Sequence, residues 1–126
     1  IGAVQLNNTL TSVSTAQAVT AAQAKVLGDR DFGFGQAWQD VTSSRAVGAI
    51  YVNNTGRPIQ LLISCSDTAG QVDVEFYVDG SSILTQRYDV SGSYGTANIS
   101  VIIPSGSTYR LTLSGGAAIV KWSELR

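Results

Sequence analysis

The sequence predicts a mainly β protein: an antiparallel β-sandwich or jelly-roll head preceded by a short N-terminal α-helical stalk. Two observations favour this class. Residues 38–126 hold eight of the ten aromatic residues and alternate between apolar and polar positions, with turn residues between the runs. Residues 3–30 contain no aromatic residue and are rich in Ala, Thr, Gln, Ser and Val. We therefore divide the chain into a stalk or linker, residues 1–32, and a head, residues 33–126.

A short helix is expected in the stalk, over about residues 20–28. Thr20 and Gln23 have the spacing of a capping box, and Gly28 would end the helix. Val19, Ala22 and Val26 follow the a-d-a spacing of a heptad seam, which favours a parallel homotrimer with its helices packed about one axis. Charged residues make up only 13% of the chain, about half the usual share, so other subunits are expected to cover part of the surface. A helix lying on its own domain is the alternative.

Period-two alternation indicates seven to eight short strands. Val72, Val74 and Phe76 share one face of a strand that ends at the hairpin signal Asp79-Gly80. Further strands are expected in residues 38–42, 47–53, 59–65, 83–88, 99–103, 109–113 and 118–122. The side chains expected in the core are those of Trp38, Val74, Phe76, Val101, Leu111, Val120 and Trp122. Arg57 and Arg126 are expected to pair with Asp40 and Glu124.

Composition argues against several kinds of function. The net charge of −1 gives no basic field for nucleic acid, and no apolar run approaches the ~20 residues of a membrane span. The chain has no His and one cysteine, Cys65, so a Ser-His-Asp triad and a cysteine-based zinc site are impossible. Cys65 lies in a strand-like run and is expected to be buried. We expect no catalytic residues, no metal and no cofactor, and thus no enzyme.

Two patterns that could indicate chemistry have simpler explanations. Asp73 and Glu75 lie on the same face of a strand, roughly 7 Å apart, a separation that suits a glycosidase pair. We prefer a solvent-facing polar row, because nothing nearby is expected to raise the pKa of either carboxyl. Asn7, Asn53 and Asn98 begin Asn-x-Ser/Thr triplets, which match glycan acceptors. Such triplets also arise by chance in a chain rich in these residues.

Four stretches resemble the C-terminal region of tail-fibre proteins from tailed bacteriophages and prophages. They are residues 10–27, residues 33–45, residues 51–59, and the ending, residues 103–109 with 121–126. Trp-Gln-Asp-Val-Thr at 38–42, Asn-Thr-Gly-Arg-Pro-Ile at 54–59 and Trp-Ser-Glu-Leu-Arg at 122–126 are specific in combination, although each alone is weak. The chain departs from the family at Ala24, where Gly is usual, and throughout residues 64–98.

The resemblance implies a location and a function. Such fibres are generally homotrimers whose tips sit at the distal end of the virion's tail fibre, after synthesis in the bacterial host cytoplasm. They bind a bacterial surface receptor, either a lipopolysaccharide sugar or an outer-membrane protein, with no nucleic-acid partner and no membrane insertion. Because residue 1 is Ile rather than Met, we expect a piece of a longer fibre protein.

Two other functions remain as alternatives. One is a trimerisation or capping domain of a fibre, without direct receptor contact. The other is a hydrolase of surface polysaccharide, which the absence of His and of a convincing acidic pair argues against.

Receptor contacts are expected in the middle stretch, in the loops around Asp67–Gly70 and Asp89–Asn98. Tyr supplies rigid amphipathic contact area, while Ser, Asn and Asp supply hydrogen bonds, and loops on a rigid sandwich commonly carry recognition. An ordinary long hairpin connection is the alternative for residues 89–98. The candidate contact residues are Asp67, Thr68, Tyr88, Asp89, Ser93, Tyr94 and Asn98.

Overall fold

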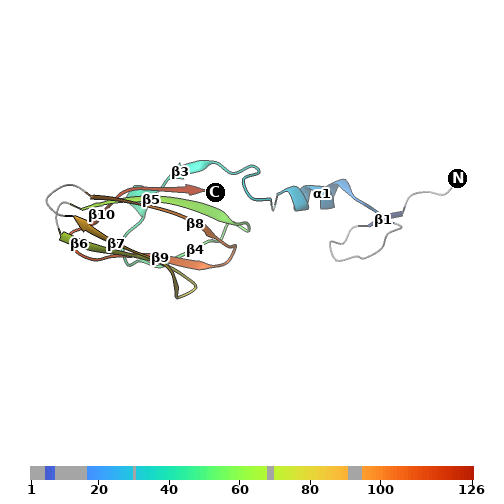
Figure 1. Ribbon diagram of the computed structural model, residues 1–126. Coiled ribbons are helices and arrows are strands. Elements are labelled where there is room, and N and C mark those ends of the chain that lie inside the picture. The colour runs from blue at the N-terminus through green and yellow to red at the C-terminus, as the bar shows by residue number, and fades with distance from the viewer. Residues whose placement is uncertain (1–4, 8–16, 30, 68–69, 91–94) are drawn as a thin grey trace.

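Two four-stranded antiparallel sheets face each other as a β-sandwich in the computed structural model (Figure 1). The structure describes residues 5–7, 17–29, 31–67, 70–90 and 95–126. A two-stranded pair and one helix precede the sandwich along the chain. The expected mainly β class and the sandwich are therefore confirmed.

The strand order is that of a jelly roll. Sheet 1 has the order β3-β10-β5-β8 and sheet 2 the order β4-β9-β6-β7, so most connections cross from one sheet to the other, as in two nested Greek keys. Sheet 1 contains β3 (Trp38–Asp40), β10 (Ala118–Leu125), β5 (Ile59–Asp67) and β8 (Gly95–Ile103). Sheet 2 contains β4 (Tyr51–Val52), β9 (Thr108–Leu113), β6 (Gly70–Val78) and β7 (Ser81–Val90). A short 3-10 helix, η1 (Thr42–Ser44), follows β3.

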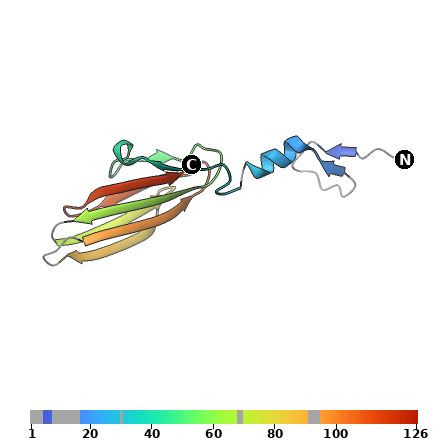
Figure 2. The same ribbon diagram turned by 90° about the horizontal axis from the view of Figure 1, so that it is seen from above.

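The N-terminal elements lie beyond one end of the sandwich (Figures 1 and 2). They are β1 (Gln5–Asn7), which pairs in parallel with β2 (Gln17–Val19), and the helix α1 (Ala21–Gly28). The two strands were not expected from the sequence. The Thr20 cap is confirmed, because the Gln23 amide donates to Thr20 Oγ1 at 3.3 Å.

The C-terminus of α1 differs from the expectation in its cap. Gly28 is the last helical residue, and Asp29 caps the helix in the right-handed αR conformation, with φ −67°. The helix therefore ends at Gly28, as expected, although Gly28 does not take the positive φ of a glycine cap. The helix buries none of its residues. Ala22 is exposed and Val26 is 38% exposed, whereas the side chain of Val19 lies outside the described part of the chain.

The core follows the alternation of the sequence. Val72, Val74 and Phe76 of β6 are buried, while Asp73 and Glu75 point to the outer face of sheet 2. Leu111 and Trp122 are also fully buried, as predicted. Inward residues of β5 include Cys65, which is 1% exposed, and burial raises the pKa of its thiol to about 11. The thiol is thus neutral and sheltered at neutral pH, as expected of a structural cysteine.

Two of the expected core residues lie on the surface. Val120 is 55% exposed, because the register of β10 against β5 shifts between Ile119 and Lys121 and Val120 sits in that irregularity. Trp38 is 48% exposed, because β3 is a three-residue edge strand whose residues are all exposed. Val101 faces the core but is only half-buried. The strand expected over residues 47–53 is limited to β4.

The two ends of the sandwich differ in what forms them. The end away from α1, called here the far end, holds the C-termini of β5, β7 and β9 and the N-termini of β6, β8 and β10 (Figure 1). The opposite end, called here the α1 end, holds the hairpin turn Asp79-Gly80. Both turn residues have positive φ, 49° and 78°, as the predicted Asp-Gly hairpin requires.

Candidate functional site

Asp67 and Tyr88 come together at the far end of the sandwich. Both line a cavity of about 10 Å³, with Val72, Ala97 and other residues of the two sheets, which is room for about one water molecule. Asp67 is only 4% exposed. Tyr88 is half-buried against the core, and its hydroxyl donates to Gln86 Oε1 at 2.6 Å. These two candidates therefore shape the far end from inside more than they present side chains to a partner.

Asp67 packs against the turn between β9 and β10. A Cβ atom added to Gly116 would lie 3.2 Å from Asp67 Oδ1, and one added to Gly115 would lie 2.9 Å from the Gln71 carbonyl oxygen. Gly115 also has φ 72°, so both its conformation and its packing require glycine. The buried carboxylate, the glycine pair and the start of β6 thus form one packed unit at the far end.

Asp89 and Asn98 lie on opposite outer faces of the sandwich. Asp89 is exposed on β7, opposite Gln71 in sheet 2. Asn98 is exposed on β8 in sheet 1 and accepts a hydrogen bond from Ser64 at 2.8 Å. The expected loop over residues 89–98 is shorter than predicted, because β7 extends to Val90 and β8 begins at Gly95. The candidates Thr68, Ser93 and Tyr94 lie outside the described residues.

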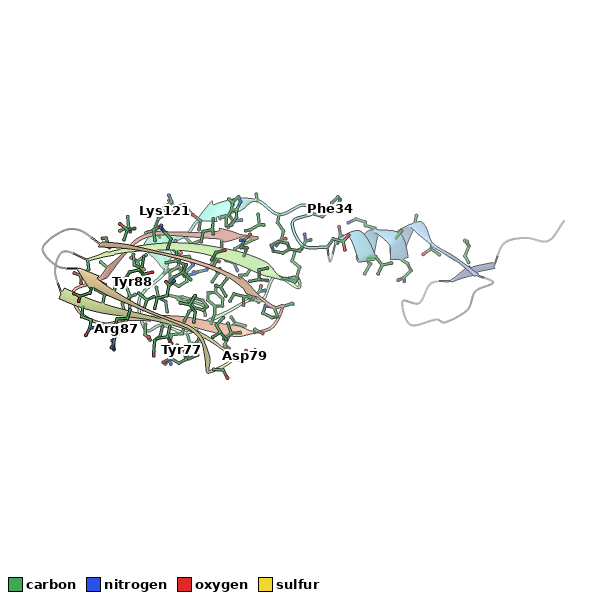
Figure 3. All side chains as sticks on the ribbon, viewed as in Figure 1. Phe34, Tyr77, Asp79, Arg87, Tyr88 and Lys121 are labelled. Carbon is green, nitrogen blue, oxygen red and sulfur yellow. The ribbon has the colours of Figure 1, made fainter. Side chains whose placement is uncertain are left out.

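The outer faces of the two sheets differ in charge. Sheet 2 carries an ion pair between Arg87 and Asp73, with contacts of 2.6 and 3.1 Å, and a hydrogen bond from Tyr77 to Glu75. Arg87 lowers the pKa of Asp73 by hydrogen bonding to it, which is the opposite of what a general acid needs. Figure 3 shows Arg87 and Tyr77 on this outer side. The contacts therefore favour the polar row over a glycosidase pair.

Sheet 1 presents a largely uncharged outer face. Ser64, Asn98 and Ser100 line a shallow groove of about 230 Å³ together with Leu62. The apolar side chains on this face include Trp38, Leu62 and Ile102, exposed by 48%, 41% and 55%. Its described charged side chains are Lys121 and Asp40, which pair with each other. That ion pair, with a hydrogen bond from Thr42, lowers the pKa of Asp40.

A buried ionic cluster lies between the sheets. Glu124 is 0% exposed and is held by Arg45 through Nε–Oε1 at 2.8 Å and Nη2–Oε2 at 2.9 Å. The Tyr109 hydroxyl donates to Glu124 Oε1 at 2.9 Å, and Arg126 Nη1 lies 3.3 Å from Oε2. Burial and the charge of Glu124 raise the pKa of Tyr109 to about 12. The guanidinium of Arg45 also lies 4.5 Å from the centre of the Tyr51 ring.

Of the two ion pairs expected from the sequence, one is present in the structure and the other is not. Arg126 pairs with Glu124 as predicted. Arg57 does not pair with Asp40; it donates to the carbonyl oxygen of Phe34, and Asp40 binds Lys121 instead. Sequence reasoning missed Arg45, although it ends one of the stretches that resemble tail fibres.

Asn53 organises the α1 end. Its side-chain amide donates to the carbonyl oxygens of Arg57, Ile103 and Pro104, at 2.8 to 3.1 Å, and its Oδ1 accepts from Thr55. Asn53 is 0% exposed, so its amide is inaccessible to a glycosylating enzyme in the folded chain. The Asn-Thr-Gly-Arg-Pro stretch is therefore explained by turn structure.

Metal and membrane features can be assessed for the described residues. They contain no group of three His, Cys, Asp or Glu side chains that could share a metal ion. Among them, no helix is long and apolar enough to cross a bilayer.

Comparison with known proteins identifies no relative. No family model, no curated protein and no solved structure matches the chain. The likeness to phage tail fibres accordingly stays a prediction from the sequence motifs, and function has to be inferred from the fold and the surface.

Proposed function

We propose that this chain is the receptor-binding tip of a phage tail fibre, a non-catalytic domain that attaches the virion to a bacterial surface receptor. The observation that carries the proposal is how the sequence divides between the two ends of the sandwich. Three of the four stretches that resemble tail fibres, residues 33–45, residues 51–59 and the ending, meet at the α1 end, through the Asn53 hydrogen bonds and the pairing of Ala37 with Arg126. The borders of the divergent stretch, Ser64 and Asn98, pair with each other on β5 and β8. The stretch supplies the β5–β6 and β7–β8 connections at the far end and the Asp79-Gly80 hairpin at the α1 end.

This division suits an attachment domain. The α1 end would join the head to the fibre, and the far end, where the divergent stretch has two of its three connections, would point away from the fibre, toward the cell. The fold is compatible with such a role, because jelly rolls occur in viral and lectin domains, although a fold alone does not decide function. Three weak sites in a trimer, and several fibres on one virion, would raise avidity by roughly 10²–10⁴ over a single site.

Adsorption of the purified chain to bacteria tests the proposal. A panel of mutants lacking lipopolysaccharide sugars or single outer-membrane proteins should include one that no longer adsorbs the chain, which identifies the receptor class. The double variant Asp89→Ala/Tyr94→Ala should adsorb at least tenfold less, about 1.4 kcal/mol. Thr85→Ala, an exposed position in the middle of β7, is the matched control and should adsorb normally. Unchanged adsorption of the double variant would place the site elsewhere.

A second candidate is a trimerisation or capping domain without receptor contact. The uncharged outer face of sheet 1 favours it, because exposed Trp38, Leu62 and Ile102 suit burial against other copies of the chain better than exposure to water. A trimer that adsorbs to no bacterial strain in the panel would support this candidate over the first.

A further inference from the structure

Arg110 differs from the other basic residues in the part of the chain that the structure describes. Each of the others donates to an oxygen: Lys25 to Asp29, Arg45 and Arg126 to Glu124, Arg57 to the Phe34 carbonyl, Arg87 to Asp73 and Lys121 to Asp40. Among the described residues, the Arg110 side chain has no carboxylate within ion-pair distance and donates no hydrogen bond. Its guanidinium contacts the ring of Tyr77 instead, 4.4 Å from the ring centre.

The stacked pair borders a small pocket at the α1 end of sheet 2. The pocket has a volume of about 100 Å³, and its lining residues are Ile50, Tyr77, Gly80, Thr108, Tyr109 and Arg110. Direct pairing of Tyr77 on β6 with Arg110 on β9 places the two side chains together. The hairpin turn that contains Gly80 closes one side, and Figure 3 shows Tyr77 near the turn residue Asp79.

The pocket combines a held cation with an apolar wall. Stacking on Tyr77 orients the guanidinium plane, and Tyr77 is itself held by its hydrogen bond to Glu75. Ile50 is 66% exposed and offers an apolar surface beside the charge. A planar guanidinium without a carboxylate partner matches one carboxylate through two parallel hydrogen bonds.

We propose that this pocket binds the carboxylate of an acidic sugar, with Ile50 against the carbon face of the sugar ring. A single guanidinium balances one negative charge, and the nearby Glu75 disfavours a doubly charged phosphate. The choice of a sugar rests on the proposed attachment function, whereas the preference for a carboxylate rests on Arg110 alone. The pocket lies at the α1 end and is separate from the far end.

Titration calorimetry with glucuronic acid, glucose and inorganic phosphate tests the site. Glucuronic acid should bind the full chain at least tenfold more tightly than glucose, which has the same ring without the carboxylate. Arg110→Gln should weaken glucuronic acid binding at least tenfold, and Arg110→Lys should weaken it less, because the charge remains without the planar fork. Arg87→Gln is the matched control on the same face: Arg87 already binds Asp73, so its loss should leave binding unchanged.

Several results would overturn the site. Glucose binding as tightly as glucuronic acid, phosphate binding more tightly than glucuronic acid, or equal losses in Arg110→Gln and Arg87→Gln would each do so. The far-end variant Asp89→Ala/Tyr94→Ala separates the two proposals. If this variant still binds glucuronic acid, the pocket is supported. If the chain also adsorbs to no bacterium, the attachment function fails while the pocket stands.

Discussion

Removing the Arg45 side chain should destabilise the head strongly, because it leaves a buried carboxylate short of donors. Glu124 is 0% exposed in the parent chain, and Arg45→Met would leave it two donors, the Tyr109 hydroxyl, which lies at 2.9 Å, and Arg126, which lies at 3.3 Å. Breaking a buried ion pair by deleting one partner costs about 3–5 kcal/mol. The two remaining donors place the expected loss near the lower limit, at about 3 kcal/mol, against a total stability of about 5–15 kcal/mol for a domain.

A double substitution separates charge burial from lost packing. In Arg45→Met/Glu124→Gln the buried group is neutral, and the glutamine oxygen can still accept from Tyr109. The double variant should therefore be more stable than Arg45→Met, with a loss of about 1–2 kcal/mol relative to the parent. Arg87→Met removes a surface pair whose Arg87 side chain is 64% exposed, so the free energy of unfolding should fall much less than in Arg45→Met, because solvent screens such a pair.

Urea unfolding followed by tryptophan fluorescence measures these differences. Trp122 reports on the cluster, because its ring contacts Tyr51 and Tyr51 contacts Arg45. Protein concentration is held constant, since any assembly of the chain would shift the apparent stability. A loss in Arg45→Met no larger than that in Arg87→Met, or a double variant less stable than Arg45→Met, would refute the reasoning.

Three further outcomes are expected. Trp122→Ala should cost about 3–5 kcal/mol by opening a cavity in the core; an unchanged melting temperature would contradict the burial of Trp122. The folded pKa of Tyr109, about 12, exceeds the unfolded value of about 10, so its stabilisation is complete below pH 10. That stabilisation, about 2–3 kcal/mol, should be lost between pH 10 and 12. Urea unfolding across this range measures the loss, and the free energy of unfolding of Tyr109→Phe should not show this decrease. The parent chain should sediment as a trimer of 13.2 kDa subunits. The variant Ile102→Lys, on the uncharged face of sheet 1, should sediment as a monomer, while the matched control Thr85→Lys should remain a trimer. A trimeric Ile102→Lys would exclude that face from the interface.

Local patterns explain which parts of the fold could be predicted. Alternation in β6, the Asp79-Gly80 turn and the Thr20 cap each depend on residues close together in sequence, and the structure contains all three. The exposed Val120 could not be predicted, because alternation alone does not reveal a register shift within a strand. Trp38 could not be placed, because the width of a sheet and its edge strands are set by tertiary pairing.

The candidate site was less predictable for the same reason. Asp67 did carry a signal, since Ile59, Leu61, Ile63 and Cys65 alternate inward on β5 and Asp67 continues their period. Arg45 and Glu124 are 79 residues apart, and a single sequence gives no sign of such a pairing. Arg110 likewise became notable only once the partners of the other basic residues were known.

The pairing of β5 with β8 and of β6 with β7 at the far end has a practical consequence for engineering. β5 and β8 pair without a break from Ile59–Ile103 to Asp67–Gly95, and β6 and β7 pair up to Gly70–Val90. The chain therefore leaves and re-enters the sandwich at fixed points that the sheets themselves hold in place. A foreign peptide grafted between such anchors would cost mainly loop-closure entropy, about 0.6 kcal/mol for each doubling of its length. The head could accordingly serve as a display scaffold, with randomised inserts after Asp67 or Val90 selected for new targets while the opposite end stays untouched.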